Sequence, residues 1–460
     1  MSMKWKTLLC SDRPRPSTSQ RDHRAQFERD FDRTIFSTPV KRLQDKAQVF
    51  PLEPHDAVRT RLTHSLEVSS VARGLGIAIG QWLLAEKLIE PGMERSIEAI
   101  SATCGLIHDL GNPPFGHSGE DAIRQWFDTR FGESGLGGEL HGNSQLVQDL
   151  LKFDGNAQSL RLLTKLQILA DFHGLNLTFG TLSASCKYTA PSHEAGGNGA
   201  HPRSKPGYFA SESDDVRRIR EETGTGDARN PIAYLVEAAD DIVYSVADIE
   251  DAVKKGVLAW HPLEDDLKKT DHPSMEAALI RTRKILKAET DKIPEDLKDD
   301  IWASAFRTSV IWVVVEAALD ESKEQYDAIM AGQYSRELVK DCEAWTLVKK
   351  LKDVGKTQVY CTPSNLKLEL MGRHVICDLM DVFWEGAKVL PINGKLPTTK
   401  TFPGKVCALL SDNYRRVFCH SVETMRDLPQ QYHRFQLVTD YVCGMTDTFA
   451  KRLHTELMNG

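Results

Sequence analysis

The chain has 460 residues, of which 41% are hydrophobic and 27% charged, and this composition is typical of a soluble globular protein with one large core or two to three smaller ones. Its formal net charge of −7 gives no global attraction to nucleic acid or to an anionic membrane, so Arg and Lys must gather locally wherever an anionic ligand binds. No window reaches the ~18 consecutive apolar residues of a membrane span, so no membrane association is expected.

The first twenty residues, MSMKWKTLLCSDRPRPSTSQ, contain only a short apolar stretch before charges and prolines follow, which is too little for a signal peptide. We treat 1–20 as an N-terminal extension. The cysteines are odd in number and scattered, without a CxxC pair, at Cys10, Cys104, Cys186, Cys342, Cys361, Cys377, Cys407, Cys419 and Cys443. This pattern predicts a reduced, cytoplasmic protein without a thiolate metal site.

Apolar residues at helical spacing, among many Ala, Leu, Glu, Lys and Gln residues, predict a mainly α fold. In chain order, the predicted long helices cover 62–87, 94–110, 118–130, 143–171, 231–255, 262–290, 295–333 and 427–456. Two short segments, 174–184 (GLNLTFGTLSA) and 357–361 (TQVYC), are the candidates for small strands. The strands are therefore expected to be few and short.

Residues 189–213, TAPSHEAGGNGAHPRSKPGYFASES, interrupt the helices and are rich in Gly, Pro and Ser. Loops of this length are usually functional lids or disordered connections. The prolines and glycines of 390–404 mark a second boundary. Together these features predict four parts, namely 1–20, a core over 21–260, a helical region over 261–390 and a C-terminal helical region over 391–460.

Four groups suggest chemistry: His64 in RTRLTHSLEV, His108 and Asp109 in GLIHDLGNPPFGHSGED, and Asp240 in YLVEAADDIVYSVAD. Two imidazoles and two carboxylates suit Mn, Fe, Ni, Zn or Mg. Each histidine taken alone is more often a satisfied core or surface residue, and Asp240 has an ion pair with an arginine as its alternative. The apolar run AISATCGLI before His108 favours a buried pair that a metal would satisfy.

The segment around Asp240 adds a geometric argument. Asp240, Tyr244 and Asp248 follow one another at intervals of four residues, so they share one face of the predicted helix. Polar groups aligned on an otherwise apolar helix suggest a lined cleft. A solvated face is the alternative, because Asp241 and Glu250 give this helix a wet side as well.

The ordered set His64, His108, Asp109 and Asp240 resembles the signature of the HD superfamily of metal-dependent phosphohydrolases. Four blocks narrow the resemblance to the deoxyguanosine triphosphate triphosphohydrolases: KRLQDKAQVFPLEPHDAVRTRLTHSLEV (41–68), GLIHDLGNPPFGHSGED (105–121), FDGNAQSLRLLTKLQ (153–167) and CGMTDTFA (443–450). These blocks occur in the family's order, and the resemblance extends from about residue 20 to the C-terminus. A lone His-Asp pair is weak evidence, whereas four collinear blocks are strong.

The resemblance implies an HD-domain helical core over 21–260, a region over 261–390 that completes the active-site cleft, and further C-terminal helices over 391–460 that make subunit contacts. It implies a divalent metal ion, namely Mn, Mg or another transition metal such as Fe or Ni, held by the four residues of the signature. The implied reaction is hydrolysis of a deoxynucleoside triphosphate (dNTP) to deoxynucleoside and inorganic triphosphate by attack of water on the α-phosphorus.

The resemblance also implies catalytic roles for His117, Glu120 and His141. The carboxylate of Glu120 would hold the imidazole of His117 and raise its basicity, while the sequence leaves open which proton moves. Ser118 and Asp121 have a structural alternative as a helix cap, and this role is compatible with the first because it uses different side chains.

Substrate contacts follow from the same resemblance. Arg59, Arg61, Lys187 and Tyr188 are expected beside the phosphates, with ordinary surface charge as the alternative for the cations. For the deoxyribose, the expected contacts are Gln48 and Asp248 at the 3′-hydroxyl and the Tyr244 ring where a 2′-oxygen would lie. The base preference cannot be read from the sequence.

Assembly is likewise implied by resemblance: a homo-oligomer, expected to be a hexamer, in which Arg434 reaches a neighbouring subunit's site, with single-stranded DNA as a candidate effector. Two other functions remain open at this stage. One is an HD-type phosphodiesterase, and the other is a binding protein that senses nucleotides or single-stranded DNA without turnover.

Overall fold

The computed structural model describes residues 2–16, 23–52, 57–133, 135, 137–140, 143–167, 171–196, 201–286, 294 and 297–458. These residues form a mainly α-helical protein, which confirms the predicted fold class. Within them the sheet consists of β1 (Ala190–Pro191) and β2 (Pro206–Tyr208), which pair in parallel. Both strands belong to the Gly/Pro-rich segment 189–213, where sequence reasoning expects an irregular loop.

The N-terminal half supplies most of the elements around the site. In chain order it contains α1 (Trp5–Leu8), α2 (Gln26–Ile35), α3 (Thr38–Arg42), the 3₁₀ turn η1 (Leu43–Asp45), α4 (Arg61–Ala85), α5 (Met93–Ile107), α6 (His117–Glu133), the 3₁₀ turn η2 (Gly138–Leu140), α7 (Ser144–Leu151), α8 (Gly155–Arg161), the π-helical turn η3 (Leu162–Leu166), α9 (Phe179–Ser185), the 3₁₀ turns η4 (His201–Arg203) and η5 (Ala210–Glu212), and α10 (Ser213–Thr223).

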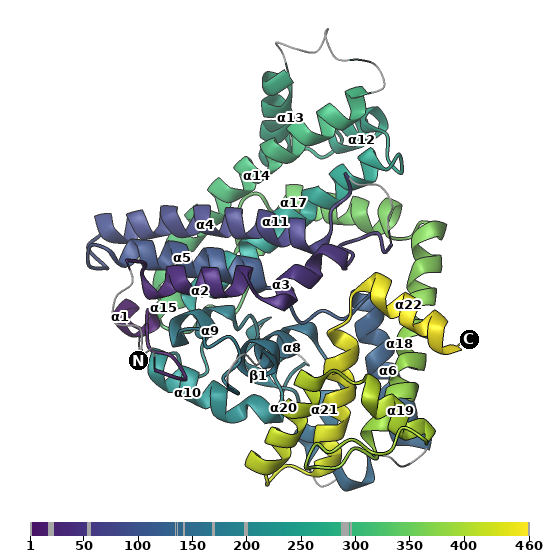
Figure 1. The fold of residues 1–460 in the computed structure, drawn as a ribbon. Coiled ribbons are helices and arrows are strands. Elements are labelled where there is room, and N and C mark those ends of the chain that lie inside the picture. Colours follow the sequence, from purple (N-terminus) through teal and green to yellow (C-terminus); the bar gives the residue numbers. More distant parts are fainter. Residues whose placement is uncertain are drawn as a thin grey trace.

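The regular elements among the described residues of the C-terminal half are all helices or helical turns. It contains α11 (Pro231–Lys254), α12 (Trp260–Leu267), α13 (Pro273–Leu286), α14 (Lys298–Glu324), α15 (Tyr326–Met330), α16 (Leu338–Asp341), α17 (Trp345–Val354), the π-helical turn η8 (Gly355–Val359), α18 (Pro363–Ala387), α19 (Phe402–Leu409), α20 (Asp412–Thr424), α21 (Gln430–Cys443) and α22 (Asp447–Met458). Helices α12 and α13 project from the body with one end of α14, whereas α18 to α22 gather at the opposite end (Figure 1).

Two hydrophobic cores hold the helices together. The first is built from side chains of α4, α5, α11, α14 and α17, such as Leu75, Ile242 and Val310. The second is built from α6, α8, α18, α20 and α21, with Phe127 and Phe435 among its fully buried rings. Burial of apolar surface at this scale is the main stabilising contribution to the fold.

Helices α4 and α5 pack closely enough to bring the two histidines together. A Cβ atom on Gly105 would lie 2.7 Å from the Cα atom of Ser69, so only glycine allows this approach. At the same crossing the hydroxyl of Ser69 donates a hydrogen bond of 2.7 Å to the carbonyl of Ala102. The start of α4 is fixed by Thr60, whose side chain caps the helix at Thr63.

Several predicted elements differ from the observed ones. The predicted strand at 174–184 is wrong, because Thr178 caps α9 and most of the segment is helical. The predicted strand at 357–361 is also wrong, since it overlaps the π-helical turn η8. The predicted helix over 143–171 is broken before Gly155, where Asp154 caps a new helix.

The C-terminal half shows further differences. The predicted helix over 262–290 divides before Pro273, and the one over 427–456 divides after Cys443. Helix α18, with 25 residues, has no counterpart among the predicted helices. By length and composition alone α4 and α14 could cross a membrane, but core helices of soluble proteins pass the same test, and both helices pack against α11. The four-part division stays a prediction.

Candidate active site

A cavity of about 460 Å³ lies between the two cores, within the usual size range of small-molecule sites. Its apolar wall includes Cys104 and Val236 from the first core and Phe115 from the second. The structure brings most of the sequence-predicted residues to this one cavity, whose wall includes Gln48, Arg61, His108, Asp109, His117, Glu120, Lys187, Tyr188, Asp240 and Tyr244.

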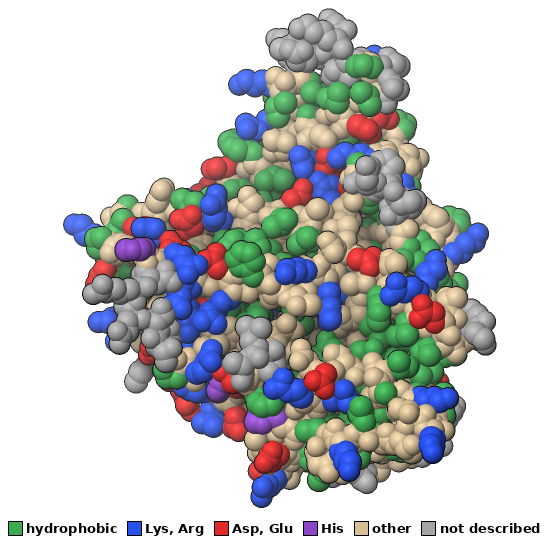
Figure 2. Space-filling model, in the orientation of Figure 1, with side chains coloured by type: hydrophobic (Ala, Val, Ile, Leu, Met, Phe, Trp, Pro, Cys, Tyr) green, Lys and Arg blue, Asp and Glu red, His purple; other side chains and the backbone are tan. Residues whose placement is uncertain are grey.

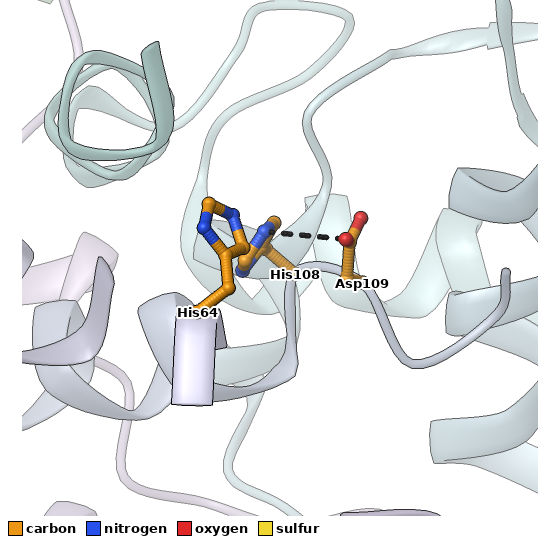
Figure 3. A group of neighbouring side chains, drawn as sticks. All are labelled: His64, His108 and Asp109. Carbon is orange, nitrogen blue, oxygen red and sulfur yellow. Dashed lines mark ion pairs between the residues drawn. The ribbon is translucent and has the colours of Figure 1, made fainter. Parts of the chain in front are cut away.

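Two helices present the histidine and aspartate side chains at one end of the cavity. His64 lies in the first turn of α4, and His108 caps the C-terminal end of α5 with Asp109 following it. Their rings face each other edge on, with centroids 5.4 Å apart. One ligand atom from each of His64, His108 and Asp109 lies within 4.8 Å of the others, and Figure 3 shows the ion pair between His108 and Asp109.

Asp240 completes this cluster from the middle of α11. Its Oδ1 atom lies 3.3 Å from Nε2 of His64 and 3.5 Å from Nε2 of His108. Four residues that are far apart in the sequence therefore meet at one point. A mixed imidazole and carboxylate set of this kind suits a divalent metal ion that keeps open positions.

The hydrogen bonds of the histidines leave ligand atoms open. Nδ1 of His108 lies 2.8 Å from the carbonyl of Gly105, which turns its Nε2 atom toward the carboxylates. Neither Nε2 of His108 nor Nδ1 of His64 has a hydrogen-bond partner, although both are buried. Buried polar groups are normally paired, so the open Nε2 atom of His108, which lies 3.7 Å from Asp109 and 3.5 Å from Asp240, fits a metal ion.

The carboxylates are ionised in spite of their burial. Burial alone would raise the pKa of Asp240, but His108, His64 and Lys187 outweigh it and hold the pKa well below its usual value. Burial would likewise raise the pKa of Asp109, and the charge of Arg61 overcomes it. Arg61 pairs directly with Asp109, and the side-chain amide of Asn112 donates a hydrogen bond of 2.7 Å to the same carboxylate.

His117 and Glu120 form a pair on the next helix, α6. Nδ1 of His117 lies 3.2 Å from Oε2 of Glu120, while Oε1 of Glu120 accepts a hydrogen bond of 2.7 Å from the backbone amide of Gly155. The imidazole is 84% exposed and its partner is buried, so the carboxylate is fixed and the ring is accessible. The hydrogen bond to Glu120 raises the pKa of His117. This arrangement suits proton exchange with a bound ligand.

Three cations line the cavity: Arg61, Lys187 and Lys205. Nζ of Lys187 lies 3.7 Å from carboxylate oxygens of both Glu237 and Asp240. Burial would lower the pKa of Lys187, but these carboxylates raise it, so the amine is charged. Lys205 was not among the predicted residues; as the only lysine of the segment 189–213, it was the obvious candidate there for meeting an anion. On the face drawn in Figure 2, Lys and Arg are instead scattered.

The residues expected at a sugar do not all reach the cavity. Gln48 and Tyr244 line it, whereas Asp248 lies behind the wall and accepts a hydrogen bond of 2.5 Å from the hydroxyl of Tyr360. Tyr360 lines the cavity, and its ring stacks near that of Tyr244 with centroids 6.4 Å apart. Sequence reasoning missed Tyr360, because its segment reads as a strand and carries no motif.

Besides Asp248, the fully buried His64 is not part of the cavity wall, and neither Arg59 nor Arg434 lines it. Arg59 pairs with Glu67, Glu250 and Asp251, and it does not line the cavity. Arg434 donates to the carbonyl of Ala387 in its own chain and lies over the ring of Phe418. His141 lies outside the described residues. Arg59 therefore joins α4 to α11 through these carboxylates, and the contact of Arg434 with a neighbouring subunit's site stays a prediction.

Comparison with known proteins points to one family. The HD domain family matches residues 61–164. The chain is 37% identical over 470 residues to a deoxyguanosinetriphosphate triphosphohydrolase-like protein of Listeria innocua, with 99% of each chain covered. It is 33% identical over 474 residues to the probable deoxyguanosinetriphosphate triphosphohydrolase of Pseudomonas aeruginosa, covering 95% of this chain and 93% of the relative. For the deoxyguanosinetriphosphate triphosphohydrolase of Yersinia enterocolitica the identity is 31% over 513 residues, covering 99% and 98%.

Proposed function

Because this chain belongs to the deoxyguanosinetriphosphate triphosphohydrolase family, we propose that it is a metal-dependent enzyme that hydrolyses dGTP or several dNTPs to deoxynucleoside and inorganic triphosphate. The observation that carries the proposal is the convergence of His64, His108, Asp109 and Asp240 at one point beside the cavity, with two buried imidazole nitrogens lacking partners. A site with open ligand atoms and three cations suits a metal-assisted reaction of an anionic substrate.

The four residues of this cluster would hold a divalent cation such as Mn²⁺ or Mg²⁺. When bound there, the cation supplies positive charge to a phosphate oxygen and acidifies water. The chain's own contribution is orientation. Asn112 and Arg61 fix the carboxylate of Asp109, and the carbonyl of Gly105 fixes the ring of His108. Such supporting contacts usually alter metal affinity by about 10- to 100-fold.

The proposed roles of the other cavity residues follow from their charge. Arg61, Lys187 and Lys205 bind the triphosphate, with Tyr188 beside them. His117, held by Glu120, exchanges a proton with the attacking water or with the 5′-oxygen of the leaving deoxynucleoside. Because the imidazole is exposed to the cavity and the carboxylate is buried, the proton moves at the ring nitrogen that faces the ligand.

Selection of a deoxyribose is proposed for the wall formed by Gln48, Tyr244 and Tyr360. Oε1 of Gln48 is buried without a hydrogen-bond partner, which leaves it free to accept a bond from a sugar hydroxyl. The stacked rings of Tyr244 and Tyr360 offer an apolar surface to the sugar. An added 2′-hydroxyl would meet this wall, and Asp248 would act on the sugar through Tyr360, to which it is hydrogen-bonded.

The direct test is an analysis of products. Purified protein is incubated with Mn²⁺ or Mg²⁺ and dGTP, and the phosphate products are separated by anion exchange. Free inorganic triphosphate and deoxyguanosine are expected, and His108→Ala serves as the control without the metal site. Pyrophosphate with a monophosphate, or no turnover with any of the four dNTPs, would contradict the proposal. The four dNTPs are tested singly and mixed, because a mixture also reveals activation by one nucleotide of another's hydrolysis.

We further propose a cytoplasmic homo-oligomer, with the hexamer as the expected state. The family assignment supports this proposal, and the exposed apolar side chains of the C-terminal helices, such as Phe402 and Leu370, suit subunit contacts. Light scattering of the purified protein decides the oligomeric state. Single-stranded DNA is added to the same sample, and a change in turnover or mass would identify it as an effector.

A further inference from the structure

The block CGMTDTFA at 443–450 contributes no residue to the cavity wall, yet it is bound to the segments that do. Asp447, the first residue of α22, is 2% exposed. Its Oδ1 atom accepts a hydrogen bond of 3.0 Å from the backbone amide of Phe115, and its Oδ2 atom accepts one of 2.9 Å from the amide of Ala47. One buried carboxylate therefore joins two segments that are distant in the sequence.

Each of these two amides lies next to a residue of the cavity. Ala47 precedes Gln48, and Phe115 is two residues before His117. The carboxylate of Asp447 thus lies between the segment that carries a proposed sugar contact and the bend that carries the proposed proton-transfer group. A charged acceptor makes stronger hydrogen bonds to backbone amides than a neutral one, so this connection is firm.

The bend itself needs support from outside. Phe115 has a φ angle of +62° and Gly116 has one of +59°, so two successive residues adopt the left-handed conformation. This conformation is unfavourable for a residue with a side chain and persists only where the surrounding structure imposes it. The ring of Phe115 packs at Gly372, where a Cβ atom would lie 2.6 Å away, and its amide is held by Asp447.

Lys46 makes a second connection at the same joint. Its buried amine donates hydrogen bonds of 2.6 Å to the carbonyl of Asn112 and 2.8 Å to the carbonyl of Cys443. Asn112 in turn holds Asp109 through its side-chain amide. Asp447, in the first turn of α22, therefore holds the 112–116 bend at Phe115. Cys443, the last residue of α21, holds it at Asn112 through Lys46.

We propose that Asp447 is a positioning residue of the active site, which sets the place of His117 and Gln48 in the cavity by holding the backbone amides of Phe115 and Ala47. This inference rests on the proposed function for its kinetic consequences. Asp447 is not itself part of the cavity wall, and it acts through the backbone amides of two wall residues, Ala47 and Phe115. It gives the C-terminal helix an indirect part in catalysis.

The test replaces Asp447 by Asn, which keeps the volume but leaves one oxygen to accept from two amides. Because small misplacements of reacting groups are costly, kcat per folded molecule is expected to fall about 10- to 100-fold. KM is expected to rise less than kcat falls, and Mn²⁺ affinity measured by calorimetry without nucleotide is expected to stay within about threefold, since metal ligands are untouched. Amide hydrogen exchange in peptides containing Ala47 or Phe115 is expected to accelerate.

Two control variants separate positioning from stability. Thr448→Ala removes the hydrogen bond of 2.7 Å to Asp45 in the same joint without touching either amide, and it is expected to keep kcat. Asp30→Asn weakens another buried carboxylate, which accepts a bond of 3.0 Å from the amide of Thr178, and it is expected to lower the melting temperature alone.

The outcomes are distinct. Faster exchange at the two amides with unchanged kcat per folded molecule would overturn the proposal, because the contact would then be merely structural. Unchanged exchange in Asp447→Asn would overturn it as well. Failure of the wild-type protein to release triphosphate would refute the proposed function, whereas the exchange measurement needs no turnover and still decides whether the carboxylate holds the bend.

Discussion

Two polar clusters of this protein each contain two carboxylates, but they differ in how completely their atoms are paired. The cavity cluster consists of His64, His108, Asp109 and Asp240. The clamp cluster consists of Arg161, Gln158, Ser211, Glu212 and Asp440. In the clamp cluster, Arg161 donates to both carboxylates, with distances of 2.7 Å to Asp440 and 3.0 Å to Glu212.

The clamp cluster leaves little for a ligand to bind. Gln158 donates to Asp440 at 2.9 Å, and Ser211 donates to Glu212 at 2.9 Å. In the cavity cluster, by contrast, two imidazole nitrogens have no partner. The difference indicates that buried nitrogen atoms without hydrogen-bond partners, rather than burial or charge, distinguish the reactive cavity cluster from the structural clamp cluster. The first cluster should therefore matter for activity and the second for stability.

The largest expected effect comes from removing one of the four side chains of the cavity cluster. His108→Ala should lower kcat by about 10⁴-fold, because one ligand of the proposed metal site is lost. The free energy of unfolding without metal should fall by only about 0.5–1.5 kcal/mol, because the ring loses one hydrogen bond, from Nδ1 to the carbonyl of Gly105, and Nε2 makes none. Steady-state kinetics and urea denaturation measure the two quantities.

Metal addition gives this prediction a control. Mn²⁺ at about 100 times its Kd should stabilise the wild-type protein by about 2.7 kcal/mol, and it should leave His108→Ala unchanged. Equal stabilisation of both proteins would show that the ion binds elsewhere and would break the comparison between the clusters.

The clamp cluster should respond in the opposite way. Arg161→Met should lower the free energy of unfolding by about 3–5 kcal/mol, because Glu212 and Asp440 are left as buried charges without their partner. The kcat of the remaining folded molecules should equal that of the wild-type protein. Denaturation followed by circular dichroism gives the stability, and active-site titration gives the folded fraction. A large loss of kcat in the folded fraction would contradict the assignment of the clamp cluster to stability alone.

A third variant separates proton transfer from metal binding within the cavity. His117→Ala should lower kcat by about 10²-fold, in the range for loss of a general acid or base. Mn²⁺ affinity should not change, because His117 pairs with Glu120 and not with the metal set. Calorimetry with Mn²⁺ separates this variant from His108→Ala, and His173→Ala, at an exposed position away from the cavity, is the matched control. Loss of Mn²⁺ binding in His117→Ala would contradict the separation of the His117–Glu120 pair from the metal site.

Sequence reasoning reached the cavity cluster but not the clamp cluster. His64, His108, Asp109 and Asp240 were found because each lies in a recognisable motif, and their helices are long and strongly periodic. Arg161 lies in the block at 153–167, but the block assigns it no role, and an arginine within a helix gives no sign that it is buried. Glu212 and Asp440 lie in none of the four blocks. Their pairing depends on how three distant segments pack, which local patterns do not encode.

The same limit applies to elements near the site. The segment 174–184 is rich in residues that also occur in strands, and it forms α9 because Thr178 caps it and the surrounding core accepts a helix. Helix α18 was missed although it closes the second core over the bend, with Gly372 packed against Phe115. Tertiary packing decides such cases, whereas the α4 and α11 patterns are sufficient in themselves.

The smallest expected effect concerns pH and sharpens the assignment of His117. The hydrogen bond and charge of Glu120 raise the pKa of His117, while the charges of Arg61 and Lys205 act to lower it. Glu120→Gln removes the first influence, so the pKa of His117 should fall and the limb of the pH–rate profile that it controls should move to lower pH. The direction is the same for either role: a proton donor would lose activity at a lower pH than in the wild-type protein, and a proton acceptor would gain activity at a lower pH.

Asp121→Asn removes an equal charge from the same helix, at a side chain paired with Arg124, and should leave the limb in place. A limb that moves equally in both variants would mean that general surface charge, and not the bond to Glu120, sets the pKa of His117.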